Sequence, residues 1–386
     1  MKERPAPLVL VVDLEAGALE ERTFGSYAAV VRVGRQLLAA ELSRRLGALG
    51  VAVGPLIPQS STPGLPFHWG RWYTAAARSA LTQARSAGRP VDTIGYAGPG
   101  SMALADDDLL EALVSAIPGE VVGNNRYSTD AFSVAGDLDL ALAALEDCPT
   151  DNTAVRCLEA SGFVPRDLAG MRWSRFDVDT PLDLALLRLA WRLPGTRRPE
   201  ATVGGFVEMA TLPGGSRLEL PGLDALGAVL RDRDAQLVVA GRIPSSAWAY
   251  LETESACRVR CFVEERGMRS ARDLAPRSLL ADWVSRLGAG DLLRELCGLG
   301  DAVILDSRVL MAALAGSSDA AAWPPEEDRF ASDFGDAARV ATPWLAELTE
   351  AAAAAPIPVL LGGHALVSDG LRILVDIAWL GHGDVP

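Results

Sequence analysis

Apolar and polar positions alternate along the chain in two rhythms, which predict strands and helices in turn. Short apolar runs end in glycine or in polar residues, as the strands of a buried sheet do. Longer segments follow the helical period and are rich in alanine and leucine. In the first half of the chain this pattern predicts strands at 8–12, 51–57, 91–96, 121–122 and 132–134, and helices at 34–49, 72–87, 106–116 and 153–160.

The second half repeats the alternation. The pattern predicts strands at 237–240, 259–263, 302–305 and 357–361, and helices at 278–287, 291–299, 308–314 and 344–355. An earlier helix pattern, from Leu182 to Trp191, ends at a segment with two prolines and a glycine, 193–200, which predicts a domain boundary.

We therefore expect an α/β protein of two domains, residues 1–194 and 200–386. Each is predicted to be a mostly parallel sheet covered by helices, because strands and helices alternate in both halves. The first is expected to be Rossmann-like, and the second to be a Rossmann-like fold of three layers.

One junction in the first half combines strand and helix signals. Asp177 and Asp179 alternate with apolar residues, as at the end of a strand. Thr180, Pro181 and Asp183 then have the pattern of a capped helix N-terminus. Both aspartates would lie on one face beside that helix, where they can bind a divalent cation such as magnesium. The alternative is that Thr180 and Asp183 form only a capping box and that the aspartates are solvated.

Composition limits the classes of partner. The 386-residue chain carries a net charge of −14, so we expect no duplex nucleic acid as partner and favour a small-molecule substrate. No apolar run is long enough to cross a membrane. The five cysteines form no CxxC pair, which predicts reduced thiols in a cytoplasmic protein. A homo-oligomer is compatible with the sequence.

The basic residues are almost all arginine, and Lys2 is the only lysine. A phosphate-binding P-loop and a pyridoxal-phosphate enzyme both need a lysine at the site, so these two chemistries are excluded. An anionic substrate would instead be held by arginine, by backbone amides or by a metal ion.

Polar loops follow three predicted strands of the first half. They are Gly98–Ser101, Gly123–Asp130 and the junction at 177–180. Ligands of open α/β sheets bind beyond the carboxyl ends of the strands, so we expect these loops to converge. In the second loop Asn124 and Asn125 can read the edge of a base and Arg126 can pair with a phosphate. The alternative is a simple turn, in which the Gly-Asn-Asn sequence serves the backbone.

The segment from Asp177 to Leu184 resembles the close of small nucleotidyltransferases of the GT-A type. The nearest likenesses are guanylyltransferases that act on phospholactate-like substrates or on the molybdenum cofactor. Their sheets carry a strand, a short acidic loop and a helix at the place where Tyr96 to Leu113 stands in this chain. The resemblance covers about residues 8–190. It implies a GT-A fold for the first domain, with nucleotide binding.

The chain differs from that family at two places. In the family, an early loop is rich in glycine and carries a basic residue. The matching residues 13–22 of this chain contain one glycine and four carboxylates. At 97–100 the sequence Ala-Gly-Pro-Gly stands where the family has a metal-binding aspartate. Two interpretations stay open: a catalytic nucleotidyltransferase domain, or a degenerate domain with a structural or regulatory role.

Four predicted strands of the second half also end in polar residues. Arg242, Arg266 and Arg308 follow three of these strands, and together they can bind a phosphate or a carboxylate. The alternative is that they pair with carboxylates only to tie loops together.

The same strand ends supply candidates for catalysis. His364 titrates near neutral pH and can act as an acid or base, with Asp306 and Arg242 as its predicted companions. Asp306, Asp328 and Asp333 can bind magnesium through carboxylate oxygens and water.

These features predict a nucleotide- or phosphometabolite-dependent transferase of the nucleotidyltransferase type, assisted by magnesium. Two other hypotheses remain. One is a non-catalytic pseudo-nucleotidyltransferase that binds a ligand, and the other is an enzyme with its chemistry only in the second domain.

Overall fold

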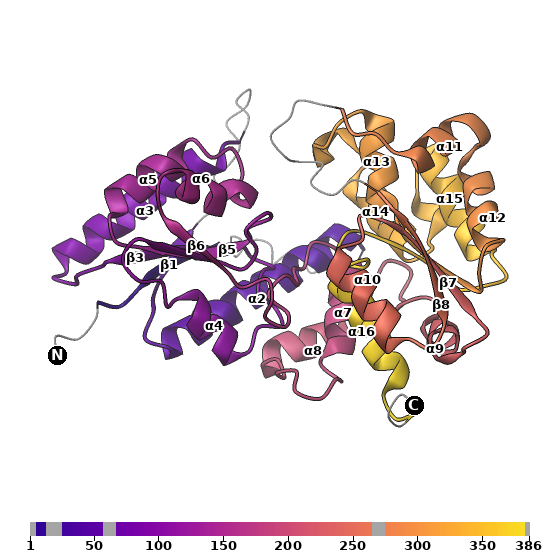
Figure 1. Cartoon of the computed structure of the whole chain (residues 1–386), viewed down its shortest axis with the longest axis horizontal. Helices are drawn as coiled ribbons and strands as arrows, with labels where there is room; N and C mark the ends of the chain where they lie inside the picture. Colours follow the sequence, from indigo (N-terminus) through magenta and orange to yellow (C-terminus); the bar gives the residue numbers. More distant parts are fainter. Residues whose placement is uncertain (1–4, 13–24, 57–66, 265–274, 383–386) are drawn as a thin grey trace. The chain divides into compact units, whose positions relative to one another are not determined.

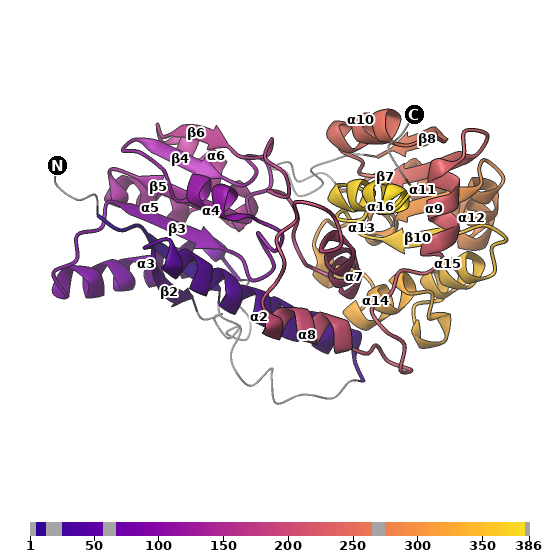
Figure 2. The same cartoon turned by 90° about the horizontal axis from the view of Figure 1, so that it is seen from below.

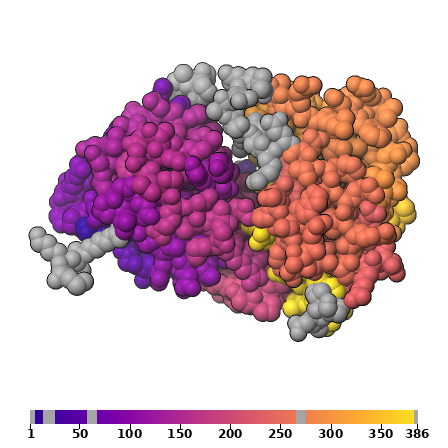
Figure 3. Space-filling model, in the orientation of Figure 1, coloured from indigo at the N-terminus to yellow at the C-terminus, as the bar shows by residue number. Residues whose placement is uncertain are grey.

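A computed structural model describes residues 5–12, 25–56, 67–264 and 275–382. The chain divides into two compact units. Figure 3 draws one face of the molecule with its atoms coloured along the sequence. The first unit comprises Met1–Arg22, Arg32–Val178 and Arg197–Val203, and the second comprises Thr23–Val31, Asp179–Thr196 and Gly204–Pro386.

The first unit is a helix-covered sheet. Its strands are β1 (Leu8–Val12), β2 (Ala52–Leu56), β3 (Thr93–Ala97), β4 (Glu120–Gly123), β5 (Ala131–Ala135) and β6 (Val164–Asp167). Its helices are most of α2 (Tyr27–Ala48), then α3 (Trp69–Ser86), α4 (Asp107–Leu113), α5 (Leu138–Glu146), the 3-10 turn η1 (Asp151–Thr153) and α6 (Ala154–Ala160).

The described strands of this sheet lie in the order β2-β1-β3-β5-β4-β6, and only β5 runs antiparallel to its neighbours. Helices α3, α5 and α6 cover one face, and α2 and α4 cover the other (Figure 1). An aromatic group fills the core under α3, with Trp69 stacked on Tyr73 and both rings against Tyr96. Burial of apolar side chains on both faces is what stabilises such a sheet.

The second unit is built around a smaller sheet. Its strands are β7 (Gln236–Gly241), β8 (Arg258–Val263), β9 (Ala302–Asp306) and β10 (Val359–Gly362). Its helices are α7 (Pro181–Ala190), α9 (Leu223–Arg231), α10 (Ser245–Glu254), α11 (Leu279–Leu287), α12 (Ala289–Cys297), α13 (Ser307–Ala315), α14 (Glu326–Asp333), α15 (Pro343–Ala353) and α16 (Asp369–Trp379), with α8 (Ala201–Met209) at its border and 3-10 turns η2 (Ala320–Ala322) and η3 (Ala337–Arg339).

All described strands of the second sheet are parallel, in the order β10-β9-β7-β8. Helices α10 and α16 pack together on one face, while α14 and α15 lie on the other (Figures 1 and 2). Parallel strands end on the same edge, so β7, β9 and β10 bring their carboxyl ends together. The α/β class with two mostly parallel, helix-covered sheets is therefore confirmed.

Several elements of the first unit differ from the prediction, and among them helix α5 was not predicted. The strand expected at 176–178 is reduced to a single antiparallel bridge between Asp177 and Ser101, because turns precede it and α7 begins at Pro181. The edge strand β6 was not predicted, because its sequence Val-Pro-Arg-Asp is partly exposed and contains a proline, which only an edge strand tolerates well.

The division into units also differs from the predicted boundary at 194–200. Helix α7 was expected to close the first domain, but it belongs to the second unit. It contacts α14 and α16, and Leu182 on α7 fills the space that a side chain at Gly362 would need. Hydrophobic packing therefore places α7 in the second unit. The segment with prolines and glycine marks the end of the helix.

Among the described residues, no helix is both long and apolar enough to span a membrane.

The predicted helix start at Thr180 is confirmed in detail. The Thr180 hydroxyl accepts from the Asp183 amide at 3.2 Å, and the Asp183 carboxylate accepts from the Thr180 amide at 2.8 Å. Pro181 occupies the first turn, where its missing N–H costs nothing. Reciprocal bonds of this kind satisfy amides that the helix itself leaves unpaired.

We predict that Thr180→Ala lowers the free energy of unfolding by about 1 kcal/mol, the usual cost of a lost N-cap. Urea denaturation followed by circular dichroism measures this change. Thr253→Ala is a matched control, because its hydroxyl only bonds back to Ala249 within α10 and caps nothing. Equal effects of the two substitutions would contradict the prediction.

Candidate functional site

Three polar loops of the first unit meet at the carboxyl end of β3. The amide of Gly98 donates to the carbonyl of Asp130 at 2.9 Å, and the amide of Val178 donates to the carbonyl of Gly100 at 3.2 Å. The loop after β3 thus bonds both to the loop that precedes β5 and to the segment that precedes α7. This is the edge at which a ligand of an open α/β sheet is expected.

The approach at Gly100 is too close for any other residue. A Cβ atom there would lie 2.3 Å from the carbonyl oxygen of Val178 and 2.8 Å from the carboxylate of Asp177. The glycine therefore serves the packing of two backbone segments, and it draws Asp177 against the end of β3.

Asn124 is a structural residue of this edge. Its side-chain oxygen accepts from the amides of Asp130 and Ala131 at 2.9 and 3.0 Å, and its amide group donates to the Ser174 carbonyl at 3.1 Å. The side chain is buried, and these bonds employ both of its polar ends. Of the two interpretations left open for Asn124, the structure shows the turn.

Asn125 and Arg126 lie nearer the surface. The Asn125 side chain accepts from the amide of Tyr127, which is an Asx turn. Arg126 forms a two-pronged ion pair with Glu159 on α6, and the two side chains are 36% and 32% exposed. The hydrogen bonds and charge of Glu159 raise the pKa of Arg126. This pair is accessible, so an incoming phosphate can compete for the guanidinium.

The two aspartates of the junction fall in different units. Asp177 belongs to the first unit and lies beside Gly100, and its carboxylate accepts from the Val178 amide at 2.9 Å. Asp179 is exposed, and its amide donates to Asp183 in the second unit. The common strand face that was predicted to align the two carboxylates is not formed, because this segment makes only one bridge.

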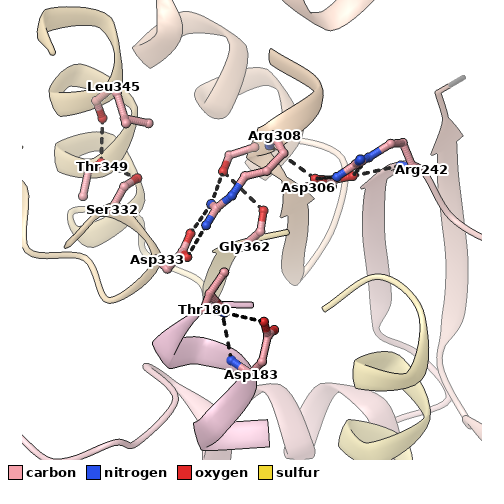
Figure 4. A network of polar contacts seen from close by, with 11 residues as sticks. Thr180, Asp183, Arg242, Asp306, Arg308, Ser332, Asp333, Leu345, Thr349 and Gly362 are labelled. Carbon is pink, nitrogen blue, oxygen red and sulfur yellow. Dashed lines mark hydrogen bonds and ion pairs between the residues drawn. The ribbon is translucent and has the colours of Figure 1, made fainter. Parts of the chain in front are cut away.

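The carboxyl edge of the second sheet carries a network of buried ion pairs (Figure 4). Arg242, just after β7, binds both carboxylate oxygens of Asp306 at the end of β9, at 2.6 and 3.0 Å. Asp306 also accepts from the amide of Arg308 at 3.2 Å and so caps α13. Burial of Asp306 opposes its ionisation, but the Arg242 guanidinium outweighs this, and the pKa of Asp306 falls below its usual value.

Arg308 points away from the surface and into the unit. Its guanidinium binds the two oxygens of Asp333 on α14 at 2.5 and 2.6 Å, and it donates to Ser307 at 3.1 Å. The side chains of Arg308 and Asp333 are 6% and 0% exposed. Burial alone would lower the pKa of Arg308, but the charge and hydrogen bonds of Asp333 raise it. The predicted role in gripping a substrate does not fit this enclosed position.

The network reaches the last strand through Ser307. The Ser307 hydroxyl donates to the carbonyl of Gly362 at the end of β10, at 3.3 Å. The ends of β7, β9 and β10 are therefore joined by polar contacts, as the strand order requires. Gly362 itself is needed for packing, because a Cβ atom there would lie 2.6 Å from Leu182.

Two of the predicted catalytic residues remain accessible at this edge. His364 is exposed, and its charge contributes to lowering the pKa of the nearby Asp306. The Arg242 side chain is 18% exposed, and it uses Nε and Nη2 for Asp306. Among the described residues none accepts a hydrogen bond from its Nη1.

Asp183 belongs to the same region and was predicted only as a helix cap. It is fully buried, and its negative charge helps to raise the pKa of Arg308. Burial, and next the charge of Asp179, raises the pKa of Asp183 to about 7. The sequence signal for this residue was its capping pattern, and nothing local indicates that Arg308 lies near it.

The two aspartates predicted as magnesium ligands on α14 face different partners. Asp333 binds Arg308, whereas Asp328 accepts from the amide and the hydroxyl of Thr342, both at 2.7 Å. Residues five positions apart do not share a helix face, which explains why the pair separates. In the part of the chain that the structure describes, no group of three or more His, Cys, Asp or Glu is placed to hold a metal ion.

Two further predictions fall outside the described ranges. Arg266 and the loop at 13–22 both lie there, and nothing in the structure bears on them.

A cavity of about 410 Å³ in the second unit lies beside the start of α2 and was not predicted. It is lined by Gly25, Ser26, Glu327 and Arg339. The Glu327 carboxylate accepts from the amides of Tyr27 and Ala28 at 3.0 and 2.9 Å. The protein's own carboxylate thus already occupies the anion-binding end of this helix.

We compared the chain with protein-family models, with curated proteins and with solved structures, and found no match.

We predict that Asp333→Ala lowers the free energy of unfolding by about 3–5 kcal/mol, because it leaves a buried guanidinium without its counter-charge. Replacing both partners, with Arg308→Met and Asp333→Leu, should recover most of that loss. Glu146→Ala is the control, because it removes the exposed partner of Arg78 and should cost at most about 1 kcal/mol. Chemical denaturation compares the variants, and a small effect of Asp333→Ala alone would contradict the buried pair.

Proposed function

We propose that the protein is a nucleotide-dependent transferase, of the nucleotidyltransferase type, that acts on a phosphorylated small molecule. The observation that carries the proposal is the meeting of three polar loops at the carboxyl end of β3. The segment from Tyr96 to Leu113 also has the order of elements that the resemblance implies. Strand β3 is followed by a turn and then by α4, which Asp106 caps.

Arg126 is the proposed phosphate ligand at this edge. A guanidinium binds a phosphate through two parallel hydrogen bonds, as it now binds Glu159. Exposed ion pairs contribute little to stability, so exchanging Glu159 for a phosphate does not disturb the fold. Tyr127 next to it is exposed and contacts the Arg126 guanidinium with its ring, which offers a surface for a base.

Asp177 is the proposed protein ligand for magnesium. Magnesium at nucleotide sites is commonly held by one or two carboxylates together with the substrate phosphates, so a cluster of three protein ligands is not required. The ion would arrive with the nucleotide and neutralise charge on its phosphates. Five free cysteines support the accompanying proposal of a reducing, cytoplasmic location.

We predict that one of GTP, CTP, ATP and UTP raises the melting temperature of the full chain, and that magnesium increases this shift. The reason is that a ligand bound only by the folded state stabilises it by mass action. Differential scanning fluorimetry with each nucleotide, with and without magnesium, measures the effect.

Variants connect that shift to the edge of the first sheet. Arg126→Ala should weaken the response to the nucleotide, and Asp177→Asn should remove its dependence on magnesium. Arg78→Ala is a matched control, because Arg78 also pairs with a carboxylate on a neighbouring helix but lies on α3. No shift with any nucleotide would refute the proposal and favour a pseudo-nucleotidyltransferase. An unchanged shift in Arg126→Ala would show that the site lies elsewhere.

A second function is favoured by the carboxyl edge of the second sheet, where we propose an acid–base site for an anionic metabolite. The supporting observation is the pairing of Arg242 with Asp306 through Nε and Nη2, together with the exposed His364, whose charge acts on the same Asp306. Arg242 would bind the anion and His364 would transfer a proton. Arg308, Asp333 and Ser307 would hold these groups in place and stay out of contact with the substrate.

We predict that inorganic phosphate or pyrophosphate shifts the imidazole resonance of His364 in proton–nitrogen NMR spectra, because an anion on Arg242 changes the field at the ring. The chain has only two other histidines, His68 and His382, which serve as internal controls. His364→Ala assigns the resonance. Equal shifts of all three histidines, or none, would contradict a site at this edge.

A further inference from the structure

Two thiols of the first unit lie close together at one core. Cys148 follows α5 and Cys157 is on α6, nine positions later. Helices α5 and α6 pack against one another, Cys148 belongs to the core beneath them, and Cys157 packs against that same core. Both cysteines are free. Cys148 is fully buried in the core under α3 and α5, whereas Cys157 packs against that core and is partly exposed.

We propose that Cys148 and Cys157 form a redox site, in which a peroxide oxidises Cys157 and Cys148 then closes a disulfide with it. The different exposure of the two thiols sets this order. A small oxidant from solvent can reach Cys157, but it cannot reach Cys148. The buried thiol is instead held beside the sulfur that has been oxidised, which is the arrangement of an attacking and a resolving cysteine.

The surroundings of Cys157 favour the thiolate, which is the reactive form. The neighbouring Cys148 thiol, and also the Thr153 hydroxyl and the charge of Arg156, lower the pKa of Cys157 against the opposing effects of burial and Asp147. The Cys148 S–H donates to the Ala144 carbonyl at 3.6 Å, and the pKa of Cys148 is raised by its interaction with Cys157 and by burial.

The other three cysteines lack such an environment. Burial raises the pKa of each of them, and for Cys261 the value is about 11. Cys297 is the useful comparison, because it is partly exposed like Cys157. Selectivity for Cys157 therefore follows from its neighbours and not from access alone.

The chemistry balances with hydrogen peroxide as the oxidant. The Cys157 thiolate attacks one peroxide oxygen, the O–O bond breaks, and sulfenic acid and hydroxide form. The Cys148 sulfur then attacks the Cys157 sulfur, the S–O bond breaks, and the proton of the Cys148 thiol leaves with the hydroxyl as water. Two thiols are oxidised to one disulfide and one peroxide is reduced. A dithiol reductant then reduces the disulfide to the two thiols and is itself oxidised to a disulfide.

The segment between the two cysteines supports the loop that precedes β5. The Tyr96 hydroxyl donates to Asp151 at 3.0 Å, and Ser128 donates to Asn152 at 2.6 Å. On α6, Glu159 lies two residues after Cys157 and pairs with Arg126. A disulfide would therefore form in direct connection with the loop at 124–130, but the proposal does not depend on nucleotide binding there.

The test treats the full-length protein with a small excess of hydrogen peroxide at neutral pH, blocks remaining thiols with N-ethylmaleimide and maps peptides under non-reducing conditions by mass spectrometry. We expect a linked Cys148–Cys157 peptide, with Cys257, Cys261 and Cys297 alkylated. Before oxidation, Cys157 should react with the maleimide at least about tenfold faster than Cys297, because its thiolate is more populated at that pH.

Variants separate the two roles. Cys157→Ser should leave Cys148 reduced under the same peroxide treatment. Cys148→Ala should stop the reaction at a sulfenic acid on Cys157, which a cyclic dione reagent traps. Cys297→Ser is the control and should leave the linked peptide unchanged. The proposal is overturned if wild-type protein yields no Cys148–Cys157 link, or if Cys157 and Cys297 react at equal rates. Both measurements use wild-type protein, so they hold even if Cys148→Ala fails to fold.

Discussion

A buried guanidinium holds the carboxyl edge of the second sheet together. Arg308 is enclosed, so its charge must be matched, and Asp333 matches it with two short hydrogen bonds. The same residue gives its amide to Asp306, which in turn binds Arg242. The network therefore fixes where β9 ends and α13 begins, and it orients the carboxylate of Asp306, whose pKa the charge of His364 helps to lower. An interior this polar is costly, and full satisfaction of its members is what makes it stable.

The first unit reaches a similar arrangement by different means. Its carboxyl edge is held by backbone contacts and by one buried amide, Asn124, which bonds to three main-chain groups across two loops. The close approach at Gly100 brings Asp177 to the same place. The proposed ligand-binding residues, Arg126 and Asp177, are therefore positioned by contacts within the protein that form without a ligand. A site built in this way is preorganised, because the cost of ordering it is met in folding.

The two proposed sites and the thiol pair differ in how they depend on the surroundings. Arg126 is exposed and paired with Glu159, so its availability is a competition between carboxylate and phosphate. Arg242 is held by a fully buried carboxylate and offers only its outer edge. The neighbouring Cys148 lowers the pKa of Cys157. In the last two cases one partner is buried while the other is partly exposed, whereas Arg126 and Glu159 are both partly exposed.

Local chemistry along the sequence determined most of the elements. Apolar runs placed the four strands of the second sheet, and the Thr180–Asp183 pattern located the start of α7, because period and capping depend on neighbours in the chain. Only the tertiary structure decided the partners. Nothing near Arg308 in the sequence points to Asp333, and helix α14 turns Asp328 and Asp333 toward different neighbours. Likewise, packing against Gly362 gives α7 to the second unit. Charge pairing and close packing join residues that are far apart in the sequence, so the partners can be identified only from the tertiary structure.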